Sequence, residues 1–210
     1  ERLCEVYSIW GSSEKMGEPY PIKYLPSGGY FGTGEAAGHH LQDGLARGYR
    51  FGFVAGSESH DGRPSRSLIH GRELVEESEP LWPPGVAAVW ADDFSRDGIF
   101  RALRARRCYG TTGARIIVRF FLGDEPMGSE VAWPDPNEPR ELRAEVIGTA
   151  PIASCVIAKN NRDVREAASD TEHLRLDYAD PARAGPADFY YLRVTQADGQ
   201  MAWASPIFLI

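Results

Sequence analysis

The sequence contains few cysteines, no long apolar run and no excess of positive charge. Its three cysteines, Cys4, Cys108 and Cys155, are far apart and lie in apolar segments, so we expect buried thiols rather than a disulfide framework or a zinc knuckle. No apolar run approaches the roughly 20 residues of a membrane span. The net charge of -7 disfavours binding to a phosphate backbone. We therefore expect a soluble globular protein with no membrane span and no nucleic-acid partner.

The stretch of residues 50–64, RFGFVAGSESHDGRP, combines a predicted buried strand with clustered polar side chains. Residues 51–55 form a short apolar run typical of parallel sheets that are covered on both faces, and Gly56 ends it. Glu58 and His60 follow, so both can lean toward one point beyond the strand's carboxyl end, where α/β folds place their chemistry. A carboxylate and an imidazole suit zinc, manganese or iron. The alternative is a polar turn whose side chains cap the following backbone.

The first half of the chain alternates predicted strands with predicted helices. Residues 3–10 and 85–91 are two further apolar strands, and together with 51–55 they predict neighbouring parallel strands of a β/α barrel or a doubly wound sheet. Glu5 lies inside the first of these strands. It faces either a wet sheet edge or an interior that holds a cation or an arginine, and the sequence leaves both alternatives open.

Two helices are predicted in this half, over residues 35–47 and 96–107. The second helix is expected to bury Phe100 in its apolar stripe. His39 and His40 lie in the first helix, where adjacent side chains point about 100° apart. At most one of the two histidines can therefore face a given site.

The pattern changes after residue 113. Asp198 and Gly199 predict a two-residue hairpin turn, because glycine readily takes the positive φ that this turn requires. Segments without helical periodicity predict an antiparallel β-sandwich over residues 115–122, 141–149, 152–159, 172–178, 188–196 and 201–209. We therefore expect an α/β domain over 1–113 and an all-β domain over 114–210. If the second domain forms a sandwich with its own core, several of Trp133, Phe189, Tyr191 and Trp203 should be largely buried.

Several motifs resemble the polymerase and histidinol phosphatase (PHP) superfamily of metal-dependent hydrolases. The sequence GSESH at residues 56–60 is similar to the G-S-D-x-H metal motif of that superfamily. Further motifs are similar to those of a largely uncharacterised bacterial group of PHP-like proteins: EVYS at 5–8, GSSE at 11–14, ARGY at 46–49, GFVAGS at 52–57, RALRARRCY at 101–109, TTGAR at 111–115 and AWASPI at 202–207. The resemblance covers nearly the whole chain. It implies the carboxyl-terminal part of a distorted β/α barrel, followed by a β-rich domain.

The resemblance also implies a chemistry and a set of site residues. It implies a hydrolase that uses divalent metal ions, zinc, manganese or iron, to cleave a phosphoester, amide or carbamate bond in a small-molecule substrate. The roles carried over are metal ligation by Glu5, Glu58 and His60, catalysis by Glu58, His60 and Asp61, and substrate contact by Arg63, His39 and His40. Asp61 and one of the two histidines would also orient the ligands, because a ligating imidazole needs a partner for its other nitrogen.

The sequence departs from the superfamily pattern in two ways. Glu58 stands where the superfamily usually has aspartate, and no H-x-H pair occurs, although the first barrel strand of the superfamily supplies one. The resemblance therefore predicts that this chain is the carboxyl-terminal part of a longer protein whose upstream part completes the barrel. The alternative is a non-catalytic binding or interaction module that keeps a degenerate barrel site as a scaffold.

Overall fold

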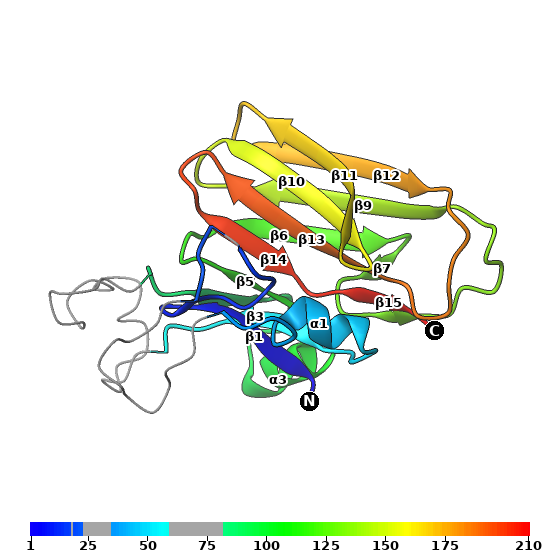
Figure 1. Ribbon diagram of the computed structural model, residues 1–210, viewed down its shortest axis with the longest axis horizontal. Coiled ribbons are helices and arrows are strands. Elements are labelled where there is room, and N and C mark those ends of the chain that lie inside the picture. The colour runs from blue at the N-terminus through cyan, green and yellow to red at the C-terminus, as the bar shows by residue number, and fades with distance from the viewer. Residues whose placement is uncertain (18, 23–34, 59–81) are drawn as a thin grey trace, which may run out of the picture.

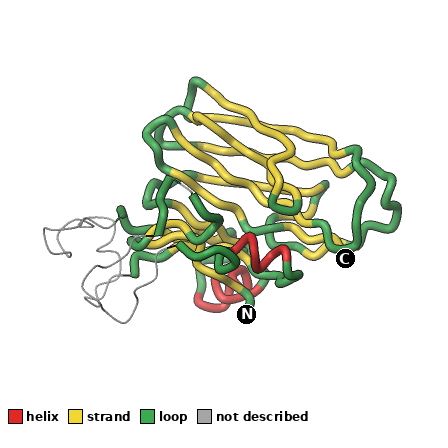
Figure 2. The backbone as a smooth tube through the Cα atoms, in the orientation of Figure 1, coloured by secondary structure: helices red, strands yellow, loops and turns green. Residues whose placement is uncertain are grey.

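The computed structural model describes residues 1–17, 19–22, 35–58 and 82–210. Strands dominate this part of the chain, and the helices α1 (Leu41–Ala46) and α3 (Arg96–Arg104) lie together at one side of the molecule (Figure 2). The β-rich part of the predicted fold is confirmed, whereas no β/α barrel is evident among the described residues, so the predicted α/β domain stays a prediction. No described helix is long and apolar enough to cross a membrane.

Two sheets pack face to face and enclose the larger hydrophobic core (Figure 1). The four-stranded sheet has the order β12-β9-β6-β7 and consists of β6 (Ile117–Leu122), β7 (Glu125–Pro126), β9 (Arg140–Ile147) and β12 (His173–Asp180). The eight-stranded sheet follows the path β11-β10-β13-β14-β5-β4 and consists of β4 (Val86–Val89), β5 (Cys108–Thr111), β8 (Glu130–Val131), β10 (Ile152–Lys159), β11 (Arg162–Ser169), β13 (Phe189–Gln196), β14 (Met201–Ala204) and β15 (Ile207–Leu209). Alternation along β6 buries Val118, Phe120 and Leu122 in the core between the sheets and leaves Arg119 exposed.

A third, smaller sheet packs on the other face of the eight-stranded sheet. It has the order β2-β1-β3 and consists of β1 (Leu3–Ser8), β2 (Gly11–Ser12) and β3 (Gly52–Ala55), with β1 and β3 parallel. Strand β13 is buried on both faces: Leu192 lies in the core between the two large sheets, whereas Tyr191 makes an edge-to-face contact with Phe53, at 5.5 Å between ring centroids. The eight-stranded sheet is therefore the central layer of the fold.

The predicted parallel pairing is confirmed for β1 with β3 and is wrong for residues 85–91. These residues do form a strand, but β4 pairs antiparallel with β5, and β5 pairs antiparallel with β14. The predicted boundary near Gly113 thus lies between β5 and β14, which are neighbours in one sheet. The division of the chain into two domains stays a prediction. Gly110 allows β5 to pack closely on β3 of the small sheet, because a Cβ at Gly110 would lie 2.8 Å from the Ala55 Cβ.

The described helices are shorter than predicted. Helix α1 begins at Leu41 because His40 has extended backbone dihedrals and forms the N-cap, so residues 35–39 are not helical. Helix α3 ends at Arg104, and Phe100 is 62% exposed rather than buried.

All residues of 114–210 are described, and none of them is helical, as predicted for this region. Strands form at or near each of the six predicted segments, and Gly199 takes a φ of 83° in the hairpin turn between β13 and β14. Phe189, Tyr191 and Trp203 are buried, whereas Trp133 is only partly buried. The prediction that several of these side chains are largely buried is therefore confirmed. The three buried rings belong to the core on the side of β1 and β3, not to the core between the two large sheets.

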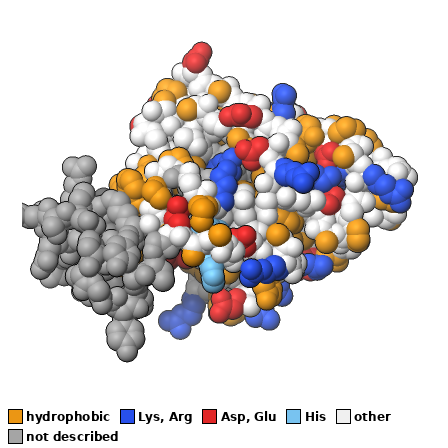
Figure 3. Space-filling view, in the orientation of Figure 1, with side chains coloured by type: hydrophobic (Ala, Val, Ile, Leu, Met, Phe, Trp, Pro, Cys, Tyr) orange, Lys and Arg blue, Asp and Glu red, His pale blue; other side chains and the backbone are white. Residues whose placement is uncertain are grey.

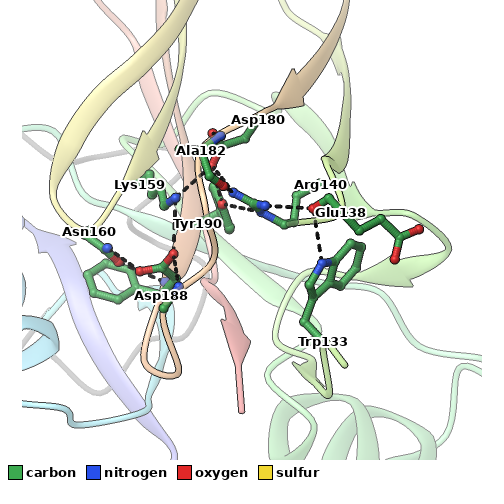
Figure 4. Close-up of polar contacts among 11 residues, drawn as sticks. Trp133, Glu138, Arg140, Lys159, Asn160, Asp180, Ala182, Asp188 and Tyr190 are labelled. Carbon is green, nitrogen blue, oxygen red and sulfur yellow. Dashed lines mark hydrogen bonds and ion pairs between the residues drawn. The ribbon is translucent and has the colours of Figure 1, made fainter. Parts of the chain in front are cut away.

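A buried polar network closes one end of the two large sheets (Figure 4). Asp180, at the end of β12, accepts hydrogen bonds from Arg140 on β9 at 3.0 Å, Lys159 on β10 at 2.8 Å and Tyr190 on β13 at 2.5 Å. Burial raises the pKa of the Asp180 carboxyl, but the bonds from Lys159 and Tyr190 outweigh burial and lower it to about 2. One ionised carboxylate therefore joins strands of both sheets.

Replacing Asp180 by asparagine is expected to lower the free energy of unfolding by about 3 kcal/mol at neutral pH, because Arg140 and Lys159 lose their shared buried carboxylate. The folded-state pKa of about 2 lies below the ordinary aspartate pKa of 3.8. The ionised carboxylate thus stabilises the fold above the unfolded pKa, and this stabilisation is lost as pH falls through the folded pKa. Urea unfolding of the unmodified protein and the variant, from about pH 7 to about pH 2, measures how this stabilisation depends on pH. Asp177→Asn, at an exposed position of the same strand, is the control, and a pH-independent difference for Asp180→Asn would contradict the explanation.

The molecular face shown in Figure 3 carries basic, acidic and hydrophobic side chains intermixed. Positive and negative groups alternate over short distances on this face, so neither sign forms a large continuous field there.

Candidate functional site

The carboxyl ends of β1 and β3 lie at the same edge of the small sheet, because the two strands are parallel. Glu5 pairs in register with Val54, and Tyr7 pairs with Ala55, so one extra residue of β1 bulges out between them. Bulges change the direction in which neighbouring side chains point. The chain leaves β3 at Gly56, directly beside the end of β1.

Glu58 reaches back toward β1. The Ser8 hydroxyl donates a hydrogen bond of 2.8 Å to Glu58 Oε2 and accepts one of 3.3 Å from the Trp10 amide. Glu58 has a φ of 54°, a left-handed conformation that is uncommon for residues other than glycine. Strained backbone of this kind occurs preferentially at functional sites.

Glu5 directs its carboxylate to the same place. Its Oε2 atom would lie 2.8 Å from a Cβ added at Gly56, so the carboxylate occupies space that only glycine leaves open. Glu5 is exposed as a residue, but desolvation of its carboxyl against the neighbouring backbone and the negative charge of Glu58 both raise the pKa of Glu5, while the nearby Ser8 hydroxyl opposes the rise. The two carboxylates thus converge near the Ser8 hydroxyl.

The two histidines lie in different environments. His39 is exposed, whereas His40 is buried at the N-cap of α1, where its backbone amide donates a 3.0 Å hydrogen bond to Asp43. His40 Nε2 has no hydrogen-bond partner within the described part of the chain, and it lies 3.9 Å from a carboxylate oxygen of Glu35. Among the described contacts, neither histidine touches Glu5 or Glu58.

The other predicted site residues, His60, Asp61 and Arg63, lie outside the described residues. Within the described ranges, no three His, Cys, Asp or Glu side chains are grouped so that they could hold a metal ion. Glu5 and Glu58 are therefore the two predicted ligands whose positions are defined, and they lie together.

A buried glutamate that the sequence did not single out connects the small sheet to the central sheet. Glu14 is fully buried and accepts hydrogen bonds of 2.6 Å from Tyr191, 2.7 Å from Arg193 and 2.6 Å from Trp203. Burial alone would lower the pKa of Arg193, but the negative charge of Glu14 raises it above its ordinary value. The local signal for this residue is weak: it is the carboxylate that ends the GSSE motif at residues 11–14.

Comparison with known proteins identifies the family. Residues 69–178 match the family described as "Protein of unknown function (DUF3604)". An uncharacterized protein of Chlamydia trachomatis is 37% identical over 226 residues, which cover 100% of this chain and 34% of the relative, and one of Chlamydia pneumoniae is 34% identical with the same coverage. The chain spans about a third of the length of these relatives. Because the family match extends over more than half of its residues, the chain belongs to the DUF3604 family.

Proposed function

We propose that the full-length protein is a metal-dependent hydrolase of the PHP type. The observation that carries the proposal is the convergence of two carboxylates, Glu5 and Glu58, at the carboxyl end of two adjacent parallel strands. Ligands and catalytic groups commonly occupy this edge in α/β folds. His60 follows Glu58 by two residues and would complete the set of ligands from this chain.

The two described carboxylates would supply part of the ligand set of a divalent cation, and residues outside the described ranges would have to supply the rest. The negative charge of Glu58 contributes to the raised pKa of Glu5, and an ion bound between the two carboxylates would offset that repulsion. Carboxylate oxygens and an imidazole nitrogen together are accepted by zinc, manganese and iron. Ser8 holds Glu58 in place, as hydrogen-bonded partners of ligating carboxylates generally do.

The bound ion would polarise a phosphoester, amide or carbamate group of a small-molecule substrate and acidify a water molecule. Asp61 would orient the imidazole of His60, and Arg63 would contact an anionic part of the substrate. Of the two histidines, His39 is accessible for substrate contact. His40 is the candidate for orienting a ligand, because its buried Nε2 lacks a hydrogen-bond partner among the described residues.

The proposal includes an upstream part of the same protein that completes the barrel. The relatives are about three times as long as this chain. Strand β2 pairs with only Tyr7 and Ser8 of β1, so the first half of β1 has no hydrogen-bonded neighbour on that side within the described residues. A further strand from the longer protein could pair there.

Metal analysis of the full-length protein tests this function. The purified protein is expected to bind divalent metal stoichiometrically, and Glu58→Gln should weaken its metal affinity at least about tenfold, because a ligand contributes at least as much as its hydrogen-bonded partners. Hydrolysis of phosphoester, amide and carbamate test substrates should fall in parallel. Glu172→Gln, at an exposed turn, is the matched control. A full-length protein that binds no stoichiometric metal after supplementation would instead be a non-catalytic scaffold or binding module.

A further inference from the structure

Two neighbouring cavities lie on the outer face of the four-stranded sheet, away from the carboxylate pair. The first has a volume of about 310 Å³ and an apolar wall that includes Trp90, Phe121, Pro126 and Met127. The second has a volume of about 420 Å³ and is lined mainly by charged side chains. Arg119 and Phe121 line both cavities, so the two are adjacent.

Strand register places the charged side chains in a row across the sheet. Arg119 on β6 pairs with Glu145 on β9, and Glu145 pairs with Arg175 on β12. Glu145 lies 3.4 Å from the Arg119 guanidinium and 3.3 Å from that of Arg175. In the next row Phe121 pairs with Arg143. The Glu145 carboxylate thus holds the guanidinium groups of Arg119 and Arg175, and Arg143 lies in the next row.

Aromatic rings fix two of these guanidinium groups. The Cζ atom of Arg119 lies 4.9 Å from the Trp90 ring centroid, and that of Arg143 lies 5.0 Å from the Phe121 ring centroid. Trp90 is itself anchored, because its Nε1 donates a 2.8 Å hydrogen bond to the Val118 carbonyl. A guanidinium stacked on a ring directs the N–H groups at its edge away from the ring, where an oxyanion can reach them. Glu145 already contacts part of the Arg119 guanidinium. Arg143 lies opposite Asp177 in the β9–β12 register, and among the described residues its guanidinium forms no ion pair with that carboxylate.

The charge of the second cavity favours an anion. Its wall carries three arginines, Arg119, Arg143 and Arg175, against two carboxylates, Glu145 and Asp177, in a protein whose net charge is -7. Arginine edges match the geometry of carboxylate, sulfate and phosphate oxygens. The adjoining apolar cavity has the size of a site for a small organic molecule.

We propose that this face binds an amphipathic anion, with its apolar ring in the cavity beside Trp90 and its carboxylate, sulfate or phosphate group on Arg119, Arg143 and Arg175. The site does not depend on the proposed metal centre, because no residue is common to the two. Its ligand contacts two fixed guanidinium groups, so little side-chain ordering opposes binding.

Calorimetric titration of the full-length protein tests the site with small probes. At least one of phenylacetate, phenyl sulfate and phenylphosphonate is expected to bind saturably, and the comparison among them identifies the preferred anionic group. Acetate lacks the ring and phenylacetamide lacks the charge, so each should bind at least about tenfold more weakly than phenylacetate. Added salt should weaken binding of the anionic probes.

Variants assign the binding to this face. Arg143→Gln should weaken the preferred probe at least about tenfold and leave the thermal unfolding midpoint unchanged, because the side chain is exposed. Arg165→Gln removes an exposed arginine of β11 and should leave binding unchanged. The proposal is overturned if no ring-bearing anion binds saturably, if acetate or phenylacetamide binds as tightly as the preferred probe, or if Arg143→Gln binds like the unmodified protein.

Discussion

Replacing Glu14 by glutamine is expected to lower the free energy of unfolding by about 3 to 5 kcal/mol. The change keeps the shape of the side chain but leaves Arg193, whose side chain is 10% exposed, without its buried carboxylate. Tyr191 and Trp203 also lose a charged acceptor. Because these three partners lie on β13 and β14 while Glu14 follows β2, the loss should separate the small sheet from the central sheet.

Denaturant unfolding of the matched variants measures this effect. Arg193→Gln should also destabilise strongly, and the double variant should lose less than the sum of the two single losses, because the pair acts as a unit. Glu166→Gln is the control, since Glu166 is exposed and accepts only a surface hydrogen bond from Ser154. A loss below about 0.5 kcal/mol for Glu14→Gln would show that the buried contacts contribute no more than surface ones.

Replacing Gly110 by valine is expected to destabilise the fold by about 3 kcal/mol or more, at the upper end of the cost of overpacking. A Cβ at this position would lie 2.8 Å from both the Ala55 Cβ and the Val6 Cγ1, and 3.0 Å from the Ala55 amide nitrogen. Ala55 belongs to β3 and cannot rotate away, so β5 would have to move from the small sheet.

Ala87→Val provides the matched control, because Ala87 is exposed and lies opposite Gly110 in the β4–β5 register. It adds a β-branched side chain to the same strand pair and should change stability by about 0.5 kcal/mol or less. Thermal unfolding of both variants distinguishes crowding from a general effect of valine. Equal unfolding midpoints for the two variants would contradict the close packing of β5 on β3.

The sequence predicts strands best where their burial pattern is regular. Segment 152–159 matches β10 at both ends, because its apolar residues are continuous between polar turns. Strand β11 was missed, since Arg162–Ser169 is a charged edge strand with few apolar residues. Strand β5 was missed because Gly110 interrupts its pattern. The role of that glycine depends on the distant β3, which local sequence does not reveal.

The candidate site also combines features that local sequence predicts with features that depend on distant parts of the chain. The position of Glu58 just after the apolar run of β3 predicts that it lies beyond the carboxyl end of that strand. The alternation of predicted strands and helices predicts the parallel pairing that brings Glu5 beside it. The bulge in β1 and the left-handed conformation of Glu58 are tertiary features with no local pattern. The role of Glu14 has no local sequence signal, because its three partners lie more than 170 residues away along the chain.

Anomalous diffraction from crystals of the full-length protein grown with zinc tests the central claim most directly. The carboxylate pair predicts an anomalous peak about 2.0 to 2.2 Å from an oxygen of Glu5 and from an oxygen of Glu58, with His60 completing the coordination. Crystals of Glu58→Gln should lose this peak, and those of Glu172→Gln should keep it. Fully ordered Glu5 and Glu58 side chains with no peak between them at saturating zinc would contradict the account.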